Sequence, residues 1–88
     1  MKYKFEFDSN KSESNKQKHG IDFIEAQVLW EDPDRIEIPA KTQIEKRFVL
    51  TGKIKVTHWS AVFTMREDIT RIISVRRARK QEVKEYES

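Results

Sequence analysis

The sequence has no cysteine among its 88 residues, and no apolar run approaches the roughly 20 residues that a membrane-spanning helix needs. The missing cysteines exclude a disulfide-stapled fold and a Cys-based zinc site, and two histidines argue against a histidine-only metal centre. The N-terminal segment also has acidic residues where a signal peptide would be apolar. We therefore expect a cytoplasmic protein with no metal, no other cofactor and no membrane partner.

Length and charge narrow the class of protein further. A chain this short is expected to form one domain, residues 1–88, with a small core, because it buries only about 60 to 65% of its unfolded surface. Residues 1–40 carry six Lys or Arg and nine Asp or Glu, whereas residues 41–88 carry twelve and six. The basic second half favours nucleic acid or an acidic protein as partner; charge that only keeps the chain soluble is an equal alternative.

The beginning of the chain predicts a strand followed by a helix. Aromatic and charged residues alternate over residues 2–7, which is typical of a half-buried strand. Residues 9–20 contain no apolar side chain, but Asp8 or Ser9 can cap a helix at its start and Gly20 suits its left-handed end. We expect a solvent-exposed helix here; composition alone would also fit a flexible linker.

A second helix is marked by a capping box. Asp22 stands at the N-cap position with Glu25 three residues later, and Pro33 ends the run. The side chains expected to face the core are Phe23, Ala26 and Trp30, widened by Ile24 and Val28.

The second half of the chain is rich in strand patterns. Strands are expected at residues 35–39, around residues 48–50, at residues 56–65 and at residues 69–75. Pro39 suits an edge strand, Gly52 allows a turn or a bulge, and residues 67–68 close a hairpin. Residues 40–44 are expected to be a connection. The strand at residues 69–75 has apolar residues at both odd and even positions, so we expect a central strand that is covered on both faces.

A last helix is expected at residues 76–87, docked through Val83 and Tyr86. The expected order of elements is β-α-α-β-β-β-α. The sequence therefore predicts an α+β domain, with a small antiparallel sheet of about four strands on which N-terminal helices and a C-terminal helix pack.

The run from residue 71 to residue 80 contains five cations and no acid, namely Arg71, Arg76, Arg77, Arg79 and Lys80. Arg76 and Arg77 are the first candidates for binding phosphate, because a guanidinium stays charged and can hold two oxygens. Adjacent strand positions face opposite ways, so both reach one phosphate only if the strand ends between them. Otherwise one of the two is a structural ion-pair arginine.

Short motifs at matching spacing run along nearly the whole chain: Phe7-Asp8, Lys11, Asn15, Lys18 to Gly20, Phe23 to Ala26, Asp32-Pro33, Glu45 to Arg47 with Gly52, Thr64 to Arg66, Arg71 to Ala78, and Glu82 to Tyr86. In this ordered set the chain resembles the BrnT family of toxins, small ribonucleases of the RelE-like superfold. The resemblance implies an RNA-cleaving toxin that does not need the ribosome. It also implies a ribbon-helix-helix antitoxin, through which alone the toxin would reach its operon DNA.

Metal-free cleavage by attack of the 2′-hydroxyl needs a base, cations around the phosphorane and an acid for the leaving oxygen. From the family pattern, Glu45 is a possible base and Arg47 a phosphate ligand; an ordinary ion pair between the two is the alternative. Arg66 could lie beside the arginine run across the hairpin, or form a salt bridge within it. Of the two histidines, His19 at the end of the first expected helix is a better catalytic candidate than His58, which is expected near the start of a strand; the alternative for His19 is a cap for helix carbonyls.

The remaining candidates are contacts to RNA. Lys18, Arg71 and Ser74 are expected to touch the substrate, with a plain solvated lysine and a hydrogen bond within the sheet as alternatives for Lys18 and Ser74. Trp59 and Tyr86 could stack on bases, although core packing is the simpler interpretation for both. A module that binds RNA without cutting it, or one whose arginines only dock an acidic antitoxin, would need the same basic surface.

Overall fold

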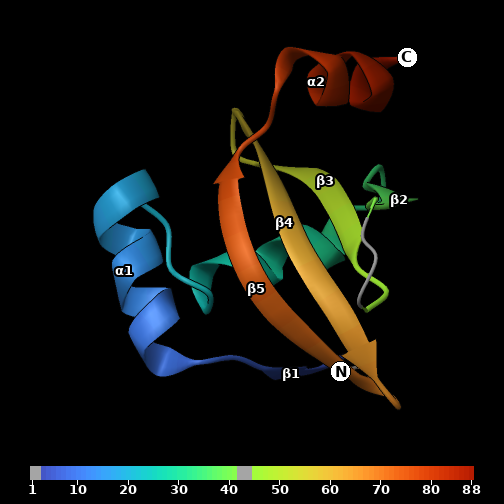
Figure 1. Ribbon diagram of the computed structural model, residues 1–88. Coiled ribbons are helices and arrows are strands. Elements are labelled where there is room, and N and C mark those ends of the chain that lie inside the picture. The colour runs from blue at the N-terminus through green and yellow to red at the C-terminus, as the bar shows by residue number, and fades with distance from the viewer. Residues whose placement is uncertain (1–2, 42–44) are drawn as a thin grey trace.

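The structure, a computed structural model, describes residues 3–41 and 45–88. In chain order its elements are β1 (Lys4–Glu6), α1 (Ser9–His19), the 3₁₀ helix η1 (Glu25–Glu31), β2 (Ile36–Pro39), β3 (Phe48–Ile54), β4 (Thr57–Arg66), β5 (Ile69–Arg77) and α2 (Lys80–Glu87). Figure 1 shows a twisted sheet with η1 across one face, α1 beside β5, and α2 at the end where β5 finishes. Residues 42–44 of the expected connection lie outside the described part of the chain.

The sheet has five strands in the order β1-β5-β4-β3-β2, so the prediction of about four strands was wrong. The strands β2 to β5 form antiparallel pairs, whereas β1 runs parallel to β5, with Lys4 opposite Ile69 and Glu6 opposite Arg71. The sheet is therefore mixed and not antiparallel. Pairing across more than 60 positions in sequence places β5 between β1 and β4, which confirms its central position.

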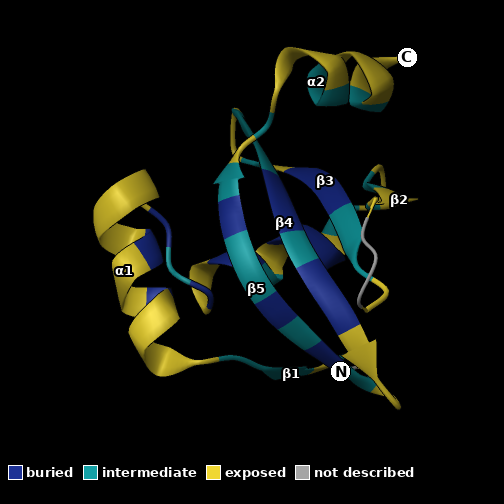
Figure 2. Cartoon of the chain, in the orientation of Figure 1, coloured by how far each residue is buried: buried dark blue, intermediate teal, exposed yellow. Residues whose placement is uncertain are grey.

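The helix α1 is confirmed, and it is less exposed than its composition predicted. Asp8 caps its start by accepting hydrogen bonds from the N–H groups of Asn10 and Lys11, and Gly20 takes a left-handed conformation at its end (φ 85°). Two polar side chains, Ser12 and Asn15, are buried against the rest of the protein. Figure 2 shows these two buried positions on the side of α1 that faces β5.

Asn15 and Ser12 dock α1 through hydrogen bonds to the backbone. The Asn15 amide nitrogen donates to the carbonyls of Ile21 and Val75, and its oxygen accepts from the Val75 N–H. The Ser12 hydroxyl accepts from the Phe23 N–H at 2.9 Å. Asn15 thus provides hydrogen-bond partners for the backbone N–H and carbonyl of Val75, at the edge of β5 beyond the residues that pair with β1. A helix without an apolar side chain is anchored by polar groups.

The second helix begins with the predicted capping box, since Asp22 accepts from the Glu25 N–H and Glu25 accepts from the Asp22 N–H. It continues as a 3₁₀ helix and not as the expected α-helix. With three residues per turn, positions 23, 26 and 29 fall on one face. Phe23, Ala26 and Leu29 are accordingly buried.

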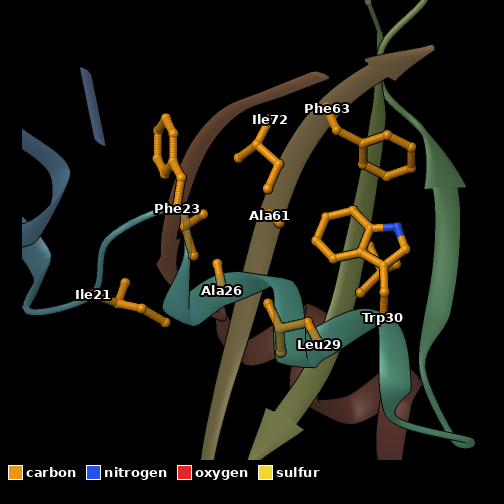
Figure 3. Packing of buried hydrophobic residues seen from close by; sticks show 10 residues of the cluster. Ile21, Phe23, Ala26, Leu29, Trp30, Ala61, Phe63 and Ile72 are labelled. Carbon is orange, nitrogen blue, oxygen red and sulfur yellow. The ribbon is translucent and has the colours of Figure 1, made fainter. Parts of the chain in front are cut away.

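The expected widening of that face is wrong. Ile24 and Val28 are 65% and 51% exposed, because the tighter helix turns them outward. Trp30 is buried as predicted, and its ring meets Phe63 edge to face at 5.3 Å between centroids. Figure 3 shows Ala26, Leu29 and Trp30 of η1 lying against the sheet.

A bulge in β5 decides which residues of that strand face η1. Val62 lies opposite Ser74 and Phe63 opposite Ile72, so Ile73 is the extra residue. Because of it, Ile72 and Val75, three positions apart, both face the core. The apolar residues at both odd and even positions of β5 are therefore explained by a shift in register and not by two covered faces.

The turns and the last helix differ from expectation in position. Gly52 lies inside β3, and a Cβ there would be 3.2 Å from Leu29, so this glycine permits the close approach of η1. The turn comes three residues later, where Lys55 has a φ of 58°. The hairpin turn at residues 67–68 is confirmed.

The strand β5 continues to Arg77, and α2 begins only at Lys80. Within the described ranges, no helix is long and apolar enough to cross a membrane.

Candidate active site

The face of the sheet opposite η1 carries four of the nine predicted site residues, namely Arg66, Arg71, Ser74 and Arg76. Side chains directly opposite each other on neighbouring strands share a face, and the register pairs Ser60 with Arg76, Val62 with Ser74, and Thr64 with Arg71. We call this side the open face, defined by His58, Ser60, Val62, Thr64, Arg66, Arg71, Ser74 and Arg76. On this face Ser74 lies between two groups of charged residues, one around Arg76 and one around Arg71. The residue opposite Ser74 on β4 is the apolar Val62.

The first group is built around Arg76. Its guanidinium is bound by both carboxylate oxygens of Glu82, at 2.8 and 2.9 Å. The Ser60 hydroxyl donates to the same carboxylate at 2.9 Å, and Ser60 in turn bonds Thr51. The Arg76 and Glu82 side chains are only 22% and 16% exposed. This group is a half-buried, bidentate ion pair at the junction of β5 and α2.

The geometry fixes the charges of both partners. The hydrogen bonds from Arg76 lower the pKa of the Glu82 carboxyl to about 2 against the opposing effect of burial, with further donation from the Arg79 N–H and Ser60. Glu82 in turn raises the pKa of Arg76. At neutral pH the pair is therefore fully ionised.

Arg76 still has donors available for a ligand. One N–H on each terminal nitrogen goes to Glu82, and Nη1 also approaches the Arg77 carbonyl at 3.4 Å. The Nε–H and a second Nη2–H make no hydrogen bond to any residue in the described ranges, and they lie on one edge of the planar guanidinium. That edge matches two oxygens of a phosphate.

Arg77 does not join Arg76. Since β5 continues through both residues, their side chains lie on opposite faces of the sheet, and the condition for sharing one phosphate is not met. Arg77 instead lies over the indole of Trp59, with 5.6 Å between its guanidinium carbon and the ring centroid. Arg76 is the arginine in a structural ion pair.

The second group lies about four residues further along β4, or roughly 13 Å at strand spacing. Here Arg71 donates to Glu6 at 3.3 Å, and Arg66 approaches the same carboxylate at 4.0 Å. The proposed salt bridge of Arg66 within the hairpin is therefore wrong: its partner is on β1, because the parallel strand brings Glu6 alongside. Asp68 of the hairpin pairs with Lys4 instead.

Glu45 and Arg47 precede β3 and bind each other. The Glu45 carboxylate accepts from the Arg47 Nε at 3.2 Å, and both side chains are about 40% exposed. The Thr64 hydroxyl of the open face donates to the neighbouring Lys46 carbonyl at 2.6 Å, which ties this segment to the second group. The arrangement has the form of the ordinary ion pair, at the far end of the open face from Arg76.

Lys18 and His19 lie elsewhere. Both are exposed at the C-terminal end of α1, beside the edge of β5 and not on the open face. The two belong to the basic last turn of α1, where cations are favourable. Among the described residues, no hydrogen bond or ion pair joins His19 to Arg76.

The sequence interpretation did not foresee how several side chains near Arg76 are paired. The His58 Nε2 is 2.6 Å from a Glu87 oxygen, and the Tyr86 hydroxyl donates to Asp32 at 2.7 Å. With Glu82, these contacts hold α2 on the end of the sheet. The one local signal was the spacing of Arg79 and Glu82, because the Glu82 carboxylate accepts from the Arg79 N–H three residues earlier, as in one half of a capping box; the other pairs join residues that are distant in sequence.

Tyr86 and Asp32 shift each other's pKa. The hydrogen bond to Asp32 raises the pKa of Tyr86 to about 12. Burial alone would raise the pKa of Asp32, but donation from Tyr86 and from the N–H groups of Asp34 and Lys53 lowers it. No group of three or more His, Asp or Glu in the part of the chain that the structure describes is arranged to hold a metal ion.

Comparison with known proteins gives one family. Residues 7–82 match the model of a family described as "Ribonuclease toxin, BrnT, of type II toxin-antitoxin system". The matched segment contains every predicted site residue and all strands except β1, which lies before it. A search of curated proteins gives no match.

Proposed function

Because the chain belongs to the BrnT family of ribonuclease toxins of type II toxin-antitoxin systems, we propose that it cleaves RNA without a metal ion. In this proposal the 2′-hydroxyl attacks the adjacent phosphate, and the bond to the 5′-oxygen of the next nucleotide breaks. The family match over residues 7–82 is the observation that carries the proposal. RNA as substrate and an antitoxin as partner follow from the family itself.

We assign the reacting phosphate to Arg76. Its unoccupied Nε and Nη2 edge can donate to two phosphate oxygens while Glu82 holds the other edge, so the cation is oriented before the substrate arrives. Arg71, Arg66 and Arg47 would bind the flanking backbone at the other end of the open face, with Ser74 between the two groups. Such placement supports a role in binding for these residues and a catalytic role for Arg76.

His58 is the acid or base that the geometry favours. It lies on the open face two positions from Ser60, the direct neighbour of Arg76, and Glu87 holds its ring. A carboxylate that orients an imidazole is a recurring arrangement in acid-base catalysis. Glu45 is less suited to be the base, because its carboxylate is paired with Arg47. This pair lies near Thr64, which is roughly 13 Å along β4 from Ser60, the neighbour of Arg76.

Cleavage of a defined RNA in the presence of EDTA tests the proposal. We expect products ending in a 2′,3′-cyclic phosphate, and no cleavage of a substrate with a 2′-deoxynucleotide at the cut. Arg76→Ala should reduce the rate on the order of 10²- to 10³-fold, as the loss of one charge-stabilising donor does elsewhere. Arg79→Ala is the matched control, since it removes the same charge three residues from Glu82. Cleavage abolished by EDTA, or intact RNA bound to the protein, would contradict the proposal.

For the partner, we propose a ribbon-helix-helix antitoxin and contact with operon DNA only through it. The test is a mobility shift with operator DNA, using the toxin alone and its complex with the protein from the neighbouring reading frame. Only the complex should shift the DNA. We further propose that residues 1–88 form one domain of the RelE-like superfold that acts on RNA in the cytoplasm.

A further inference from the structure

A concave site lies on the side of the sheet away from Arg76. It is a hollow of about 370 Å³ between Gly20 and Ile21 after α1, the helix η1, and the hairpin of β3 and β4. Its walls are the apolar side chains of Ile21, Val28, Ile54 and Trp59, with Glu25 and Lys55 also lining it. We call it the Trp59 hollow. The C-terminal end of α1, the tip of β5 and the β3–β4 turn all lie toward this end of the molecule (Figure 1).

Two cations lie near this hollow, since Lys55 is one of its lining residues and Arg77 is next to Trp59. Arg77 lies over Trp59, and the register places the two directly opposite each other on β5 and β4. Neither Arg77 nor Lys55 forms an ion pair with any residue within 3–41 or 45–88. The carboxylate of Glu25, in contrast, is bound at 2.9 Å by Lys16 and also accepts from the backbone, so its charge is offset. The hollow therefore presents an aromatic wall beside uncompensated positive charge.

A nucleotide has the chemistry that this combination fits. Every base has a flat face that stacks on an aromatic ring, and its phosphate pairs with a guanidinium or an ammonium. A volume of about 370 Å³ lies in the range of small-molecule pockets and accommodates a base with part of its ribose. An apolar side chain of a protein partner would use the walls but not the cations.

We propose that the Trp59 hollow binds one base of the RNA substrate, next to a phosphate held by Arg77. The inference rests on the proposed function for the identity of the ligand. Arg76 and Arg77 are consecutive residues at the end of β5 and face opposite ways, so an RNA strand that crosses the end of β5 meets both. One arginine contacts the reacting phosphate, and the other holds a nucleotide outside the cleaved bond. The hollow thereby sets base preference at a position away from the cut.

The test measures binding separately from cleavage. The probe is a labelled RNA with 2′-O-methyl groups at every position, which the proposed chemistry cannot cut, and its affinity is read by fluorescence anisotropy. Trp30 is 4% exposed, so quenching of tryptophan emission on binding reports on Trp59. We expect quenching in the native protein and none with Trp59→Phe. Arg77→Ala should weaken binding on the order of 10-fold or more, whereas Lys84→Ala, with the same loss of charge on α2, should not.

A pair of variants at Val28 keeps the test independent of folding defects. Val28 lines the hollow and is 51% exposed, so it tolerates polar replacement. Val28→Glu puts a carboxylate against the bound nucleotide and should weaken the affinity on the order of 10-fold, while the neutral Val28→Gln should stay closer to the native value. On cleavable RNA, Val28→Glu should also change the preferred base at a position away from the cut.

The outcomes separate this inference from the proposed function. RNA cleavage that depends on Arg76, together with unquenched Trp59 and affinities unchanged by the Val28 and Arg77 variants, would overturn the hollow as a base site. Loss of antitoxin binding in Val28→Glu with native RNA affinity would overturn it too, and assign the surface to the protein partner. Absence of cleavage, with Val28-dependent binding of the methylated RNA, would refute the ribonuclease mechanism and support the hollow.

Discussion

Replacing Asn15 by alanine should destabilise the protein more than any other single change on α1. The substitution removes the partners of three backbone groups at once: the Ile21 carbonyl, the Val75 carbonyl and the Val75 N–H. Each buried polar group left without a hydrogen bond costs about 1 to 3 kcal/mol. Because Asn15 lies near the surface at 8% exposure, water will replace part of what is lost.

We therefore expect Asn15→Ala to lower the free energy of unfolding by about 2 to 4 kcal/mol. For a domain of this size 1 kcal/mol corresponds to roughly 4 to 8 °C in Tm, so the melting temperature should fall by about 10 to 25 °C. Urea denaturation followed by circular dichroism measures the free energy, and hydrogen exchange at the Val75 amide locates it. Ser14→Ala, an exposed position on the same helix, should stay within about 0.5 kcal/mol of the native protein.

A carboxyl at the same position provides a second arm with a pH signature. In Asn15→Asp the oxygen that replaces the amide nitrogen would face the Ile21 and Val75 carbonyls, while the other oxygen keeps the Val75 N–H. The two facing carbonyls disfavour the charged form and should raise the pKa of the introduced carboxyl in the folded state. A raised folded pKa means that stability is retained at low pH and lost as the pH rises through that pKa. Relative to the native protein, this variant should thus be worse at pH 7 than at pH 4. A loss below about 1 kcal/mol in Asn15→Ala, with native protection of the Val75 amide, would refute this account of how α1 is docked.

Three further predictions concern α2 and β3. Glu82→Gln removes the charge that binds Arg76, and it should lower the free energy of unfolding, measured in urea, by about 1 to 3 kcal/mol. In the native protein the stabilisation from the lowered pKa of Glu82 is present above pH 4.5 and is lost as the pH falls toward 2, so the stability of the variant should depend less on pH in that range. Tyr86→Phe removes the hydrogen bond to Asp32 and should lower the free energy of unfolding by about 1 kcal/mol at pH 7. In an ultraviolet titration the variant should lack the tyrosinate that forms near pH 12 in the native protein. The stabilisation from this hydrogen bond is present in the native protein below pH 10 and disappears as the pH approaches 12. Gly52→Ala brings a Cβ within 3.3 Å of Asp32 and should lower the unfolding free energy by about 1 to 3 kcal/mol, and an unchanged thermal midpoint would contradict the close packing of η1 on β3.

The sequence by itself determined the features that depend on neighbouring residues. The cap of α1 at Asp8 and its left-handed end at Gly20, the capping box of Asp22 with Glu25, and the hairpin turn at residues 67–68 involve groups a few positions apart, so their chemistry can be read locally. The alternation along β4 likewise fixed which of its side chains face the core. Family membership was also visible in the order and spacing of short motifs.

Tertiary structure decided what depends on contacts between distant segments. The parallel pairing of β1 with β5, and the anchoring of a polar helix by Asn15, join residues 60 or more positions apart, and no local pattern records them. The same holds for the site. The extension of β5 to Arg77 sent two adjacent arginines to opposite faces, and α2 then supplied Glu82 to one of them. Sequence names the residues that can bind phosphate, but strand register and packing decide which of them face the same ligand.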